Sequence, residues 1–390
     1  MRFINDRFKG MSFGGLYEIF AKATELEKTG KKLVHMEIGR PDFISPQIAI
    51  EESKKALDQG HVHYTPVQGI PELRQAIVDK EKRRHGLDYS AEDEIVVTAG
   101  ACEALASVFF TILEDGDEVI GLGPYFTAYY EQSLICNFKF VEMQLKIEDG
   151  WKLDLEELRG LITPRTKAIL INSPNNPAGY ILSQEELEYI ADLAKEHDLM
   201  VISDDCYDEF VYEGQAPSIA KIEGMRERTL VVKSTSKSFS MTGWRVAYVM
   251  APSIYIKYIN KVHQNLSTCA TSFAQYGASY AFNEADEFID DMVGEFKKRG
   301  DFIYQELSKI ERLDLVKPQG AFYLFPKITK FGMSEEDFCD YILEEAGVVG
   351  VPGSNFGKSG AGHIRLAYCR TMEELEMAAE NLKIALDKLE

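Results

Sequence analysis

Residues 230–249 read LVVKSTSKSFSMTGWRVAYV, and two short apolar runs in this stretch enclose a polar turn. The runs Leu230–Val232 and Val246–Val249 are too short for helices, and their uninterrupted apolar character is typical of strands that are buried on both faces. Lys237 stands between them among hydroxyl side chains, and Arg245 follows eight residues later. We therefore expect a buried sheet with a reactive polar group where one strand ends.

Four further apolar runs precede this stretch and alternate with helical patterns. The runs are 95–97, 119–121, 168–171 and 200–202, and the helical stretches include 71–84, 102–113 and 185–196. Short buried strands that alternate with helices predict an α/β fold with a mostly parallel sheet.

The pattern changes after about residue 285. A long charged helix through Ile310 comes first, and strand candidates at 322–325 and 363–367 then mix with helices at 334–345 and 372–389. This is α+β patterning, and no linker rich in Pro, Gly or Ser separates it from the rest. We predict a large domain over residues 45–283 and a smaller domain made of 1–44 and 284–390.

Composition narrows the class of protein. No apolar run approaches the roughly 20 residues that span a bilayer, and the start MRFINDRFKG lacks the apolar stretch of a secretory signal, so we expect a cytoplasmic protein without a membrane partner. The six cysteines are scattered without metal-ligand spacing, which predicts free thiols and no metal site. A net charge of −20 argues against nucleic acid as a partner.

Polar groups follow several of the expected strands. A lysine just past a buried strand, with Arg245 nearby, has its charged form disfavoured by desolvation and by a like charge, so Lys237 is expected to offer an unprotonated amine that can form imines. Asp204 and Asp205 follow the run 200–202, where a buried carboxylate is costly unless a cation meets it. The loop 98–102 opens directly into a helix, which favours a phosphate.

The segment from Ser234 to Tyr248 resembles the Schiff-base signature of class I/II aminotransferases, a branch of the fold type I pyridoxal-phosphate enzymes, and the resemblance extends over nearly the whole chain. It implies a seven-stranded, mostly parallel sheet with helices on both faces, and pyridoxal 5'-phosphate as cofactor. It also implies that Lys237 carries the cofactor as an aldimine and moves the substrate's proton. By ping-pong chemistry an amino acid would then give its nitrogen to a 2-oxo acid, with 2-oxoglutarate as the expected acceptor.

The resemblance assigns four side chains to the cofactor's ring. Asp204 would keep the ring nitrogen protonated, and it is preferred over its neighbour because the family's spacing is Asp-x-x-Tyr. Tyr207 and Asn176 would hydrogen-bond the phenolic oxygen. Tyr125 would stack on the face of the ring.

The resemblance assigns a second group to the phosphate. Arg245, the Ser234 hydroxyl and the backbone amides of Ala101 and Cys102 would hold it, and Ser236 is a further candidate. These groups combine a guanidinium with the N-terminus of a helix.

Substrate and subunit contacts follow from the same resemblance. Arg365 would bind the substrate's α-carboxylate by two parallel hydrogen bonds, and Gly39 and Asn176 would complete that pocket. Tyr64 matches a tyrosine that reaches the phosphate of the neighbouring subunit, which implies a homodimer with shared active sites.

Other functions stay open at this point. A carbon–sulfur or other β-elimination lyase would use the same cofactor, and a non-catalytic sensor of cofactor or amino acid would use the same fold. A dehydrogenase would need a GxGxxG fingerprint after the first strand, and this chain has none there. The amino donor is equally open, since aspartate, aromatic amino acids and alanine are all compatible with the motifs.

Overall fold

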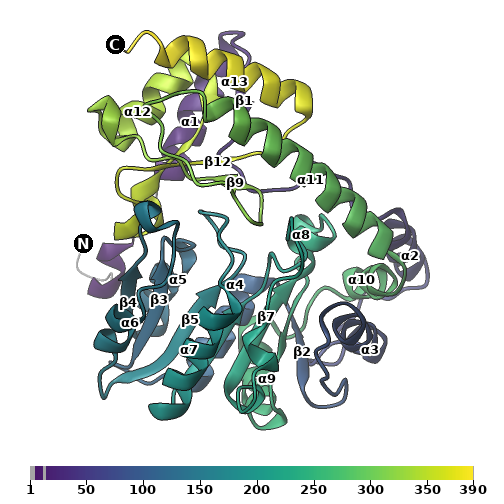
Figure 1. Cartoon of the computed structure of the whole chain (residues 1–390). Coiled ribbons are helices and arrows are strands. Elements are labelled where there is room, and N and C mark those ends of the chain that lie inside the picture. Colours follow the sequence, from purple (N-terminus) through teal and green to yellow (C-terminus); the bar gives the residue numbers. More distant parts are fainter. Residues whose placement is uncertain (1–4, 12–14, 390) are drawn as a thin grey trace.

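The computed structural model describes residues 5–11 and 15–389, and a seven-stranded sheet forms its centre (Figure 1). The strand order is β2-β8-β7-β6-β5-β3-β4. Only β8 runs antiparallel to its neighbours β2 and β7 among these strands, and the remaining pairs are parallel. The strands are β2 Ile95–Thr98, β3 Glu118–Gly123, β4 Lys139–Gln144, β5 Thr166–Asn172, β6 Met200–Asp204, β7 Thr229–Ser234 and β8 Ala247–Met250. The predicted fold class is confirmed.

Helices cover both faces of this sheet, which explains why its strands are apolar throughout. In β5, Ala168 and Leu170 belong to the core that α4 (Ala101–Ile112) and α9 (Ser253–Ser267) share with the sheet. Ile169 and Ile171 point the other way, into the core under α7 (Gln184–Glu196). Successive side chains of a strand alternate between faces, so a sheet that is covered twice needs no polar positions.

The C-terminal third forms a smaller layer above the strand ends (Figure 1). Its three-stranded antiparallel sheet has the order β11-β12-β9, and β1 pairs in parallel with β10. The N-terminal strand therefore lies with C-terminal elements, as the discontinuous small domain requires. These elements are β1 Val34–His35, β9 Tyr323–Leu324, β10 Val348–Val349, β11 Val351–Pro352, β12 Ile364–Ala367, α1 Gly15–Lys28, α11 Asp286–Leu307, α12 Glu335–Tyr341 and α13 Met372–Leu386. The domain limits at residues 45 and 284 stay a prediction.

Two details differ from the sequence-based expectation. The edge strand β4 was not expected, because its sequence KFVEMQ mixes polar and apolar residues and only one of its sides is paired. The expected helix over 71–84 divides into α3 (Pro71–Lys80) and one wider turn, Glu81–His85, that carries several charged side chains. The helices α2 (Gln47–Asp58) and α10 (Ser272–Glu284) pack beside α3.

No helix among the described residues has both the length and the apolar character needed to cross a membrane. All six cysteines are free thiols, as their scattered positions predicted.

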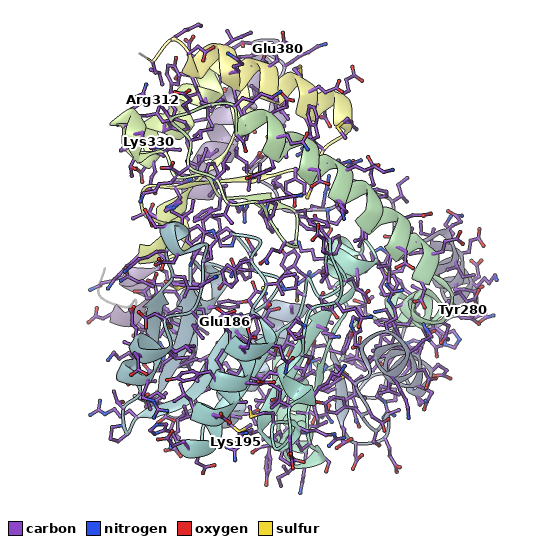
Figure 2. The ribbon with its side chains drawn as sticks, in the orientation of Figure 1. Glu186, Lys195, Tyr280, Arg312, Lys330 and Glu380 are labelled. Carbon is purple, nitrogen blue, oxygen red and sulfur yellow. The ribbon has the colours of Figure 1, made fainter. Side chains whose placement is uncertain are left out.

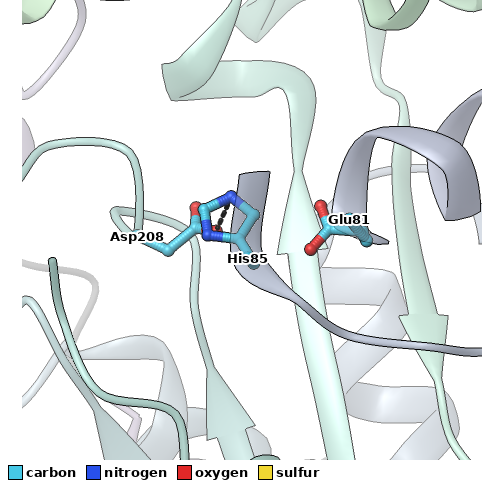
Figure 3. A group of neighbouring side chains, drawn as sticks. All are labelled: Glu81, His85 and Asp208. Atoms are coloured by element: carbon cyan, nitrogen blue, oxygen red, sulfur yellow. Dashed lines mark ion pairs between the residues drawn. The ribbon is translucent and has the colours of Figure 1, made fainter. Parts of the chain in front are cut away.

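Buried ion pairs fix the loop after β6. Figure 3 shows Glu81, His85 and Asp208, whose oxygen and nitrogen atoms lie within 4.8 Å of one another as the ligands of a metal would. Lys233 of β7, however, already pairs with Glu81 and places its Nζ 2.6 Å from Asp208 Oδ2. The lysine thus supplies the positive charge that these carboxylates need, and we assign the group a structural role.

Replacing Lys233 with Met should lower the free energy of unfolding by about 3–5 kcal/mol, because the buried Glu81 and the partly buried Asp208 lose the cation that they share. Burial by itself raises the pKa of Glu81, but Lys233 and Lys80 hold it down at about 2, against an ordinary value of 4.5. This contribution to stability is present above pH 4.5 in the native protein and is lost as the pH falls toward 2.

Urea unfolding measures both effects. Lys383→Met is the matched control, because the Lys383–Asp387 pair is more than half exposed and its loss should cost less than about 1 kcal/mol. Equal costs for the two variants would contradict the structural role of Lys233.

Candidate active site

A cavity of about 340 Å³ opens where β6 and β7 end and β12 faces them from the smaller layer. Most of the side chains and amides that the sequence singled out line it. They are Gly39, Ala101, Cys102, Asn176, Asp204, Tyr207, Ser234, Ser236, Lys237, Arg245 and Arg365. The carboxyl ends of the strands thus gather these groups, as in other open α/β sheets.

Lys237 lies in the single turn α8 (Thr235–Ser238), which begins at the end of β7. Its Nζ donates a hydrogen bond of 2.6 Å to the carbonyl oxygen of Gly39. Burial lowers the pKa of Lys237, and the guanidinium of Arg365 lowers it further. The sequence suggested Arg245 as the repelling charge, whereas the structure brings Arg365, from the smaller layer, into that position.

Asp204 ends β6 and is only 4% exposed. Its Oδ2 accepts a hydrogen bond of 2.6 Å from the Tyr129 hydroxyl, and its Oδ1 accepts one of 3.2 Å from the Cys206 amide. Burial raises the pKa of this carboxyl, and these hydrogen bonds partly oppose the rise. Within the described part of the chain no Lys, Arg or His nitrogen lies within the 4.0 Å of an ion pair, so the site has room for a cation from outside the protein.

The N-terminus of α4 faces Arg245 across the cavity floor. Gly100 has a φ of 99°, and a Cβ atom there would lie 2.1 Å from the Nη2 atom of Arg245. Arg245 itself has a left-handed φ of 58°, and its Nη1 donates to the Thr242 carbonyl at 3.1 Å. Only a glycine lets the guanidinium come this close to the first amides of the helix.

Two hydroxyl groups complete this donor set. The Oγ atoms of Ser234 and Ser236 are 2.9 Å apart and both residues line the cavity. Together with Arg245 and the helix amides they form a cradle of donors that suits a phosphate.

Arg365 of β12 is buried, and two of its three nitrogens are engaged. Nη1 donates to Asn176 Oδ1 at 3.2 Å, and Nη2 donates to the Glu37 carbonyl at 2.5 Å. Its Nε is buried and has no partner among the described residues. A buried donor without an acceptor is costly, and a bound carboxylate would satisfy it.

Tyr207 and Gly39 meet at a residue that sequence reasoning missed. The hydroxyls of Tyr207 and Tyr323 share a hydrogen bond of 2.7 Å. A Cβ at Gly39 would lie 2.0 Å from the Tyr323 hydroxyl oxygen, so a glycine is required at that position. Tyr323 sits in the short apolar strand β9 and reads as a core residue in the sequence.

Two predicted residues do not reach the cavity. Tyr125 packs against Phe140 with ring centroids 4.7 Å apart, and it is the next residue, Phe126, that lines the cavity. Phe126, and not Tyr125, therefore has its side chain in the position from which an aromatic ring could face a ligand in the cavity. Tyr64 is 85% exposed and lies outside the cavity of its own chain.

Tyr129 is the second residue that the sequence did not indicate. It is fully buried in α5 (Ala128–Cys136), and an aromatic residue in an amphipathic helix is usually part of the core. The structure shows that it lines the cavity and that its hydroxyl donates to Asp204.

The three groups of donors and acceptors fit the cofactor that the sequence implied. A cradle for a phosphate, a buried carboxylate that lacks a cation and an amine of lowered pKa all line one cavity. A protonated ring nitrogen, a phosphate and an aldehyde are the matching features of pyridoxal phosphate.

Comparison with known proteins agrees with this reading. Residues 31–382 match the model of the family described as aminotransferase class I and II. An aromatic-amino-acid aminotransferase of Thermococcus litoralis is 36% identical over 98% of both chains. An aspartate aminotransferase of Pyrococcus abyssi is 40% identical over 91% of this chain and 92% of its own.

Solved structures show the same similarity. An aromatic aminotransferase from Pyrococcus horikoshii superposes with a TM-score of 0.89 at 39% identity, over 94% of this chain and all of its own. The aspartate aminotransferase of Thermus thermophilus crystallised with maleate reaches 0.93 at 36% identity, over 99% of this chain and all of its own.

The lowered pKa of Lys237 predicts an unusually reactive amine. The rate at which a small amine-selective reagent labels Lys237, followed by mass spectrometry of the peptide, should reach half its maximum below pH 10.5. Lys383, which is 58% exposed, serves as the internal reference. A midpoint for Lys237 at or above pH 10.5 would show that burial does not favour its neutral form.

Proposed function

This chain belongs to the class I and II aminotransferase family, and we propose that the cavity around Lys237 is where an L-amino acid gives its amino group to a 2-oxo acid, expected to be 2-oxoglutarate. The protein is an aminotransferase that depends on pyridoxal 5'-phosphate. The observation that carries the assignment of the site is that Lys237, Asp204 and Arg365 line one cavity.

The residues that would hold the cofactor follow from the donor set. Arg245, the hydroxyls of Ser234 and Ser236, and the amides of Ala101 and Cys102 would hold the phosphate. Asp204 would meet the ring nitrogen, and Asn176 and Tyr207 would donate to the phenolic oxygen. Bound pyridoxal phosphate supplies an electron-accepting ring, which stabilises negative charge at the substrate's α-carbon.

Lys237 is the group that would move the proton. Its amine lies in the cavity with a lowered pKa, so it would accept the proton from the substrate's α-carbon and would deliver it to the cofactor's C4′ carbon. Its Nζ atom donates a hydrogen bond of 2.6 Å to the carbonyl of Gly39, which lies beside the proposed carboxylate pocket.

Asp204 would stay ionised beside a protonated nitrogen, because an opposite charge offsets the cost of its burial. The hydroxyl of Tyr129, which also lines the cavity, donates to this carboxylate at 2.6 Å and so fixes its orientation. Tyr129 is thus proposed as a positioning residue.

Arg365 would bind the substrate's α-carboxylate through its unpaired Nε–H and a second N–H on the edge of the guanidinium. Asn176 orients this guanidinium at 3.2 Å. The stacked rings of Tyr323 and Phe356, whose centroids both lie 4.8 Å from the guanidinium carbon, keep it from turning. The substrate is thereby held in the same cavity as the Lys237 amine.

Transfer is favoured over the β-elimination alternative, since relatives similar over nearly the full chain are named as aminotransferases, several of them for aspartate or aromatic amino acids. The sensor alternative is disfavoured for the same reason.

We also propose a homodimer. Tyr64 and its neighbour Val62 are 85% and 57% exposed, which is unusual for large apolar side chains and suits a surface that a second copy covers.

The cytoplasmic location remains a proposal, which the free thiols support. The domain limits, 45–283 for the large domain and 1–44 with 284–390 for the small one, also remain a proposal, which the β1–β10 pairing supports.

Lys237→Ala should abolish covalent attachment of the cofactor and turnover while leaving the fold intact, because the side chain contributes an amine rather than core packing. Gel filtration after incubation with pyridoxal phosphate, followed by a visible spectrum, measures attachment, and circular dichroism checks the fold. In the native protein, amino acids should bleach the visible band and 2-oxoglutarate should restore it. Lys383→Ala is the control and should behave like the native protein. Release of ammonia and pyruvate by the native protein would indicate elimination instead of transfer.

The cavity also predicts which donors react best. Lys237, Arg245 and Arg365 are the only cations among the described lining residues, and each already has an assigned partner. Ile38, Leu105 and Phe126 make much of the remaining wall apolar. We expect phenylalanine or tyrosine to exceed aspartate in kcat/KM by about tenfold or more, since an apolar wall does not compensate the desolvation of a second carboxylate. A panel of donors at fixed 2-oxoglutarate measures this, and a preference for aspartate would refute it.

A further inference from the structure

A buried glutamate–histidine pair lies behind the proposed phosphate cradle and joins α4 to α9. His263 of α9 is fully buried, and its Nδ1 is 3.0 Å from the Oε2 atom of Glu103. The Glu103 side chain is 13% exposed, and neither residue lines the cavity. Because a carboxylate can only accept, the ring nitrogen that faces it is the donor.

Glu103 uses the same carboxylate to hold the loop in front of its helix. Oε2 also accepts a hydrogen bond of 3.0 Å from the backbone N–H of Ala99, and Oε1 accepts one of 2.6 Å from the Ser107 hydroxyl. Three donors from the loop, from α4 and from α9 therefore fix one side chain. The loop cannot rotate without breaking its hydrogen bond to Glu103, and Glu103 is in turn held by His263 of α9.

This contact determines which amides stay available. The N–H of Ala99 is taken by Glu103, whereas the first amides of α4, those of Ala101 and Cys102, have no acceptor within their own helix. These are the two amides assigned to the phosphate. Their direction depends on the path of the chain through Gly100, which the Glu103–Ala99 bond sets.

The charge of Glu103 would otherwise act against an anion at this helix end. A carboxylate in the first turn that could swing toward the cavity would repel a phosphate at short range. The donors His263 and Ser107 hold it on the loop side instead. A precise anion site thus depends on a histidine that never touches the anion.

We propose that Glu103 and His263 are positioning residues for the cofactor's phosphate: His263 orients Glu103, and Glu103 orients the loop whose amides bind the phosphate. The proposal rests on the phosphate site argued above. It predicts a defect in phosphate recognition rather than a general loss of binding.

The chain offers a matched control at another helix. Glu186 occupies the same position in the first turn of α7, where it accepts hydrogen bonds from the amides of Ser183 and Leu153 at 2.7 and 2.8 Å. Figure 2 labels Glu186 on its helix, and the residue does not line the cavity. Glu186→Gln therefore removes an equivalent charge from a helix start with no proposed ligand.

The test compares two ligands on full-length protein freed of cofactor: pyridoxal phosphate, and pyridoxal, which lacks the phosphate. The dissociation constant for pyridoxal divided by that for pyridoxal phosphate measures phosphate recognition. Glu103→Gln and His263→Gln should each lower this ratio about tenfold while the affinity for pyridoxal stays within about twofold, because a charge-assisted hydrogen bond is lost. His263→Asn should keep the native ratio, since the Asn side-chain amide can take the place of Nδ1–H, and Glu186→Gln should keep it as well.

The results distinguish a failure of the proposed phosphate site from a failure of the positioning role of Glu103 and His263. A native protein that binds both ligands equally would refute the phosphate site itself. The positioning role would be overturned if the native protein prefers pyridoxal phosphate while Glu103→Gln and His263→Gln keep that preference or lose affinity for both ligands to the same extent. If a Gln variant does not fold, Ser107→Ala removes the third donor by loss of one oxygen, and an unchanged ratio in that variant would equally overturn the proposal.

Discussion

The burial of Asp204 without a cationic partner is the constraint on which the site depends. A carboxylate that is 4% exposed costs free energy unless a positive charge meets it, and the described part of the chain places none within ion-pair distance. Tyr129 and the Cys206 amide satisfy its hydrogen-bonding capacity only in part. The protein therefore holds a negative charge ready for a ligand's cation, and the nearby Lys233 network shows how the same fold treats carboxylates that have no such task.

The sheet explains why these groups meet. Parallel strands buried on both faces leave polar residues only at their ends, so Asp204 after β6 and Lys237 after β7 fall on one edge. The smaller layer adds Arg365 from β12, and the helix start at Ala101 adds backbone donors. Residues from both layers of the structure therefore line the cavity.

Much of this could be predicted from the sequence, and the failures have physical causes. Continuous apolar runs marked the inner strands correctly, but β4 is an edge strand whose exposed positions hide the pattern. Motif spacing singled out Lys237, Asp204 and Arg245, and the structure places all three in the lining of one cavity, at or just beyond the ends of neighbouring strands. Spacing selected Tyr125, but Phe126 lines the cavity, since a shift of one residue turns a side chain from the core to the cavity. Tyr129 looked like a core residue because its partner Asp204 is distant in sequence.

The central claim is that Lys237 is the residue that binds the cofactor's aldehyde. Reduction of the cofactor-loaded protein with borohydride makes this bond permanent, and digestion followed by mass spectrometry then locates it. We predict the pyridoxyl group, in about one copy per chain, on the peptide that contains Lys237. Its recovery on another lysine, above all on the buried neighbour Lys233, would contradict the assignment of the site.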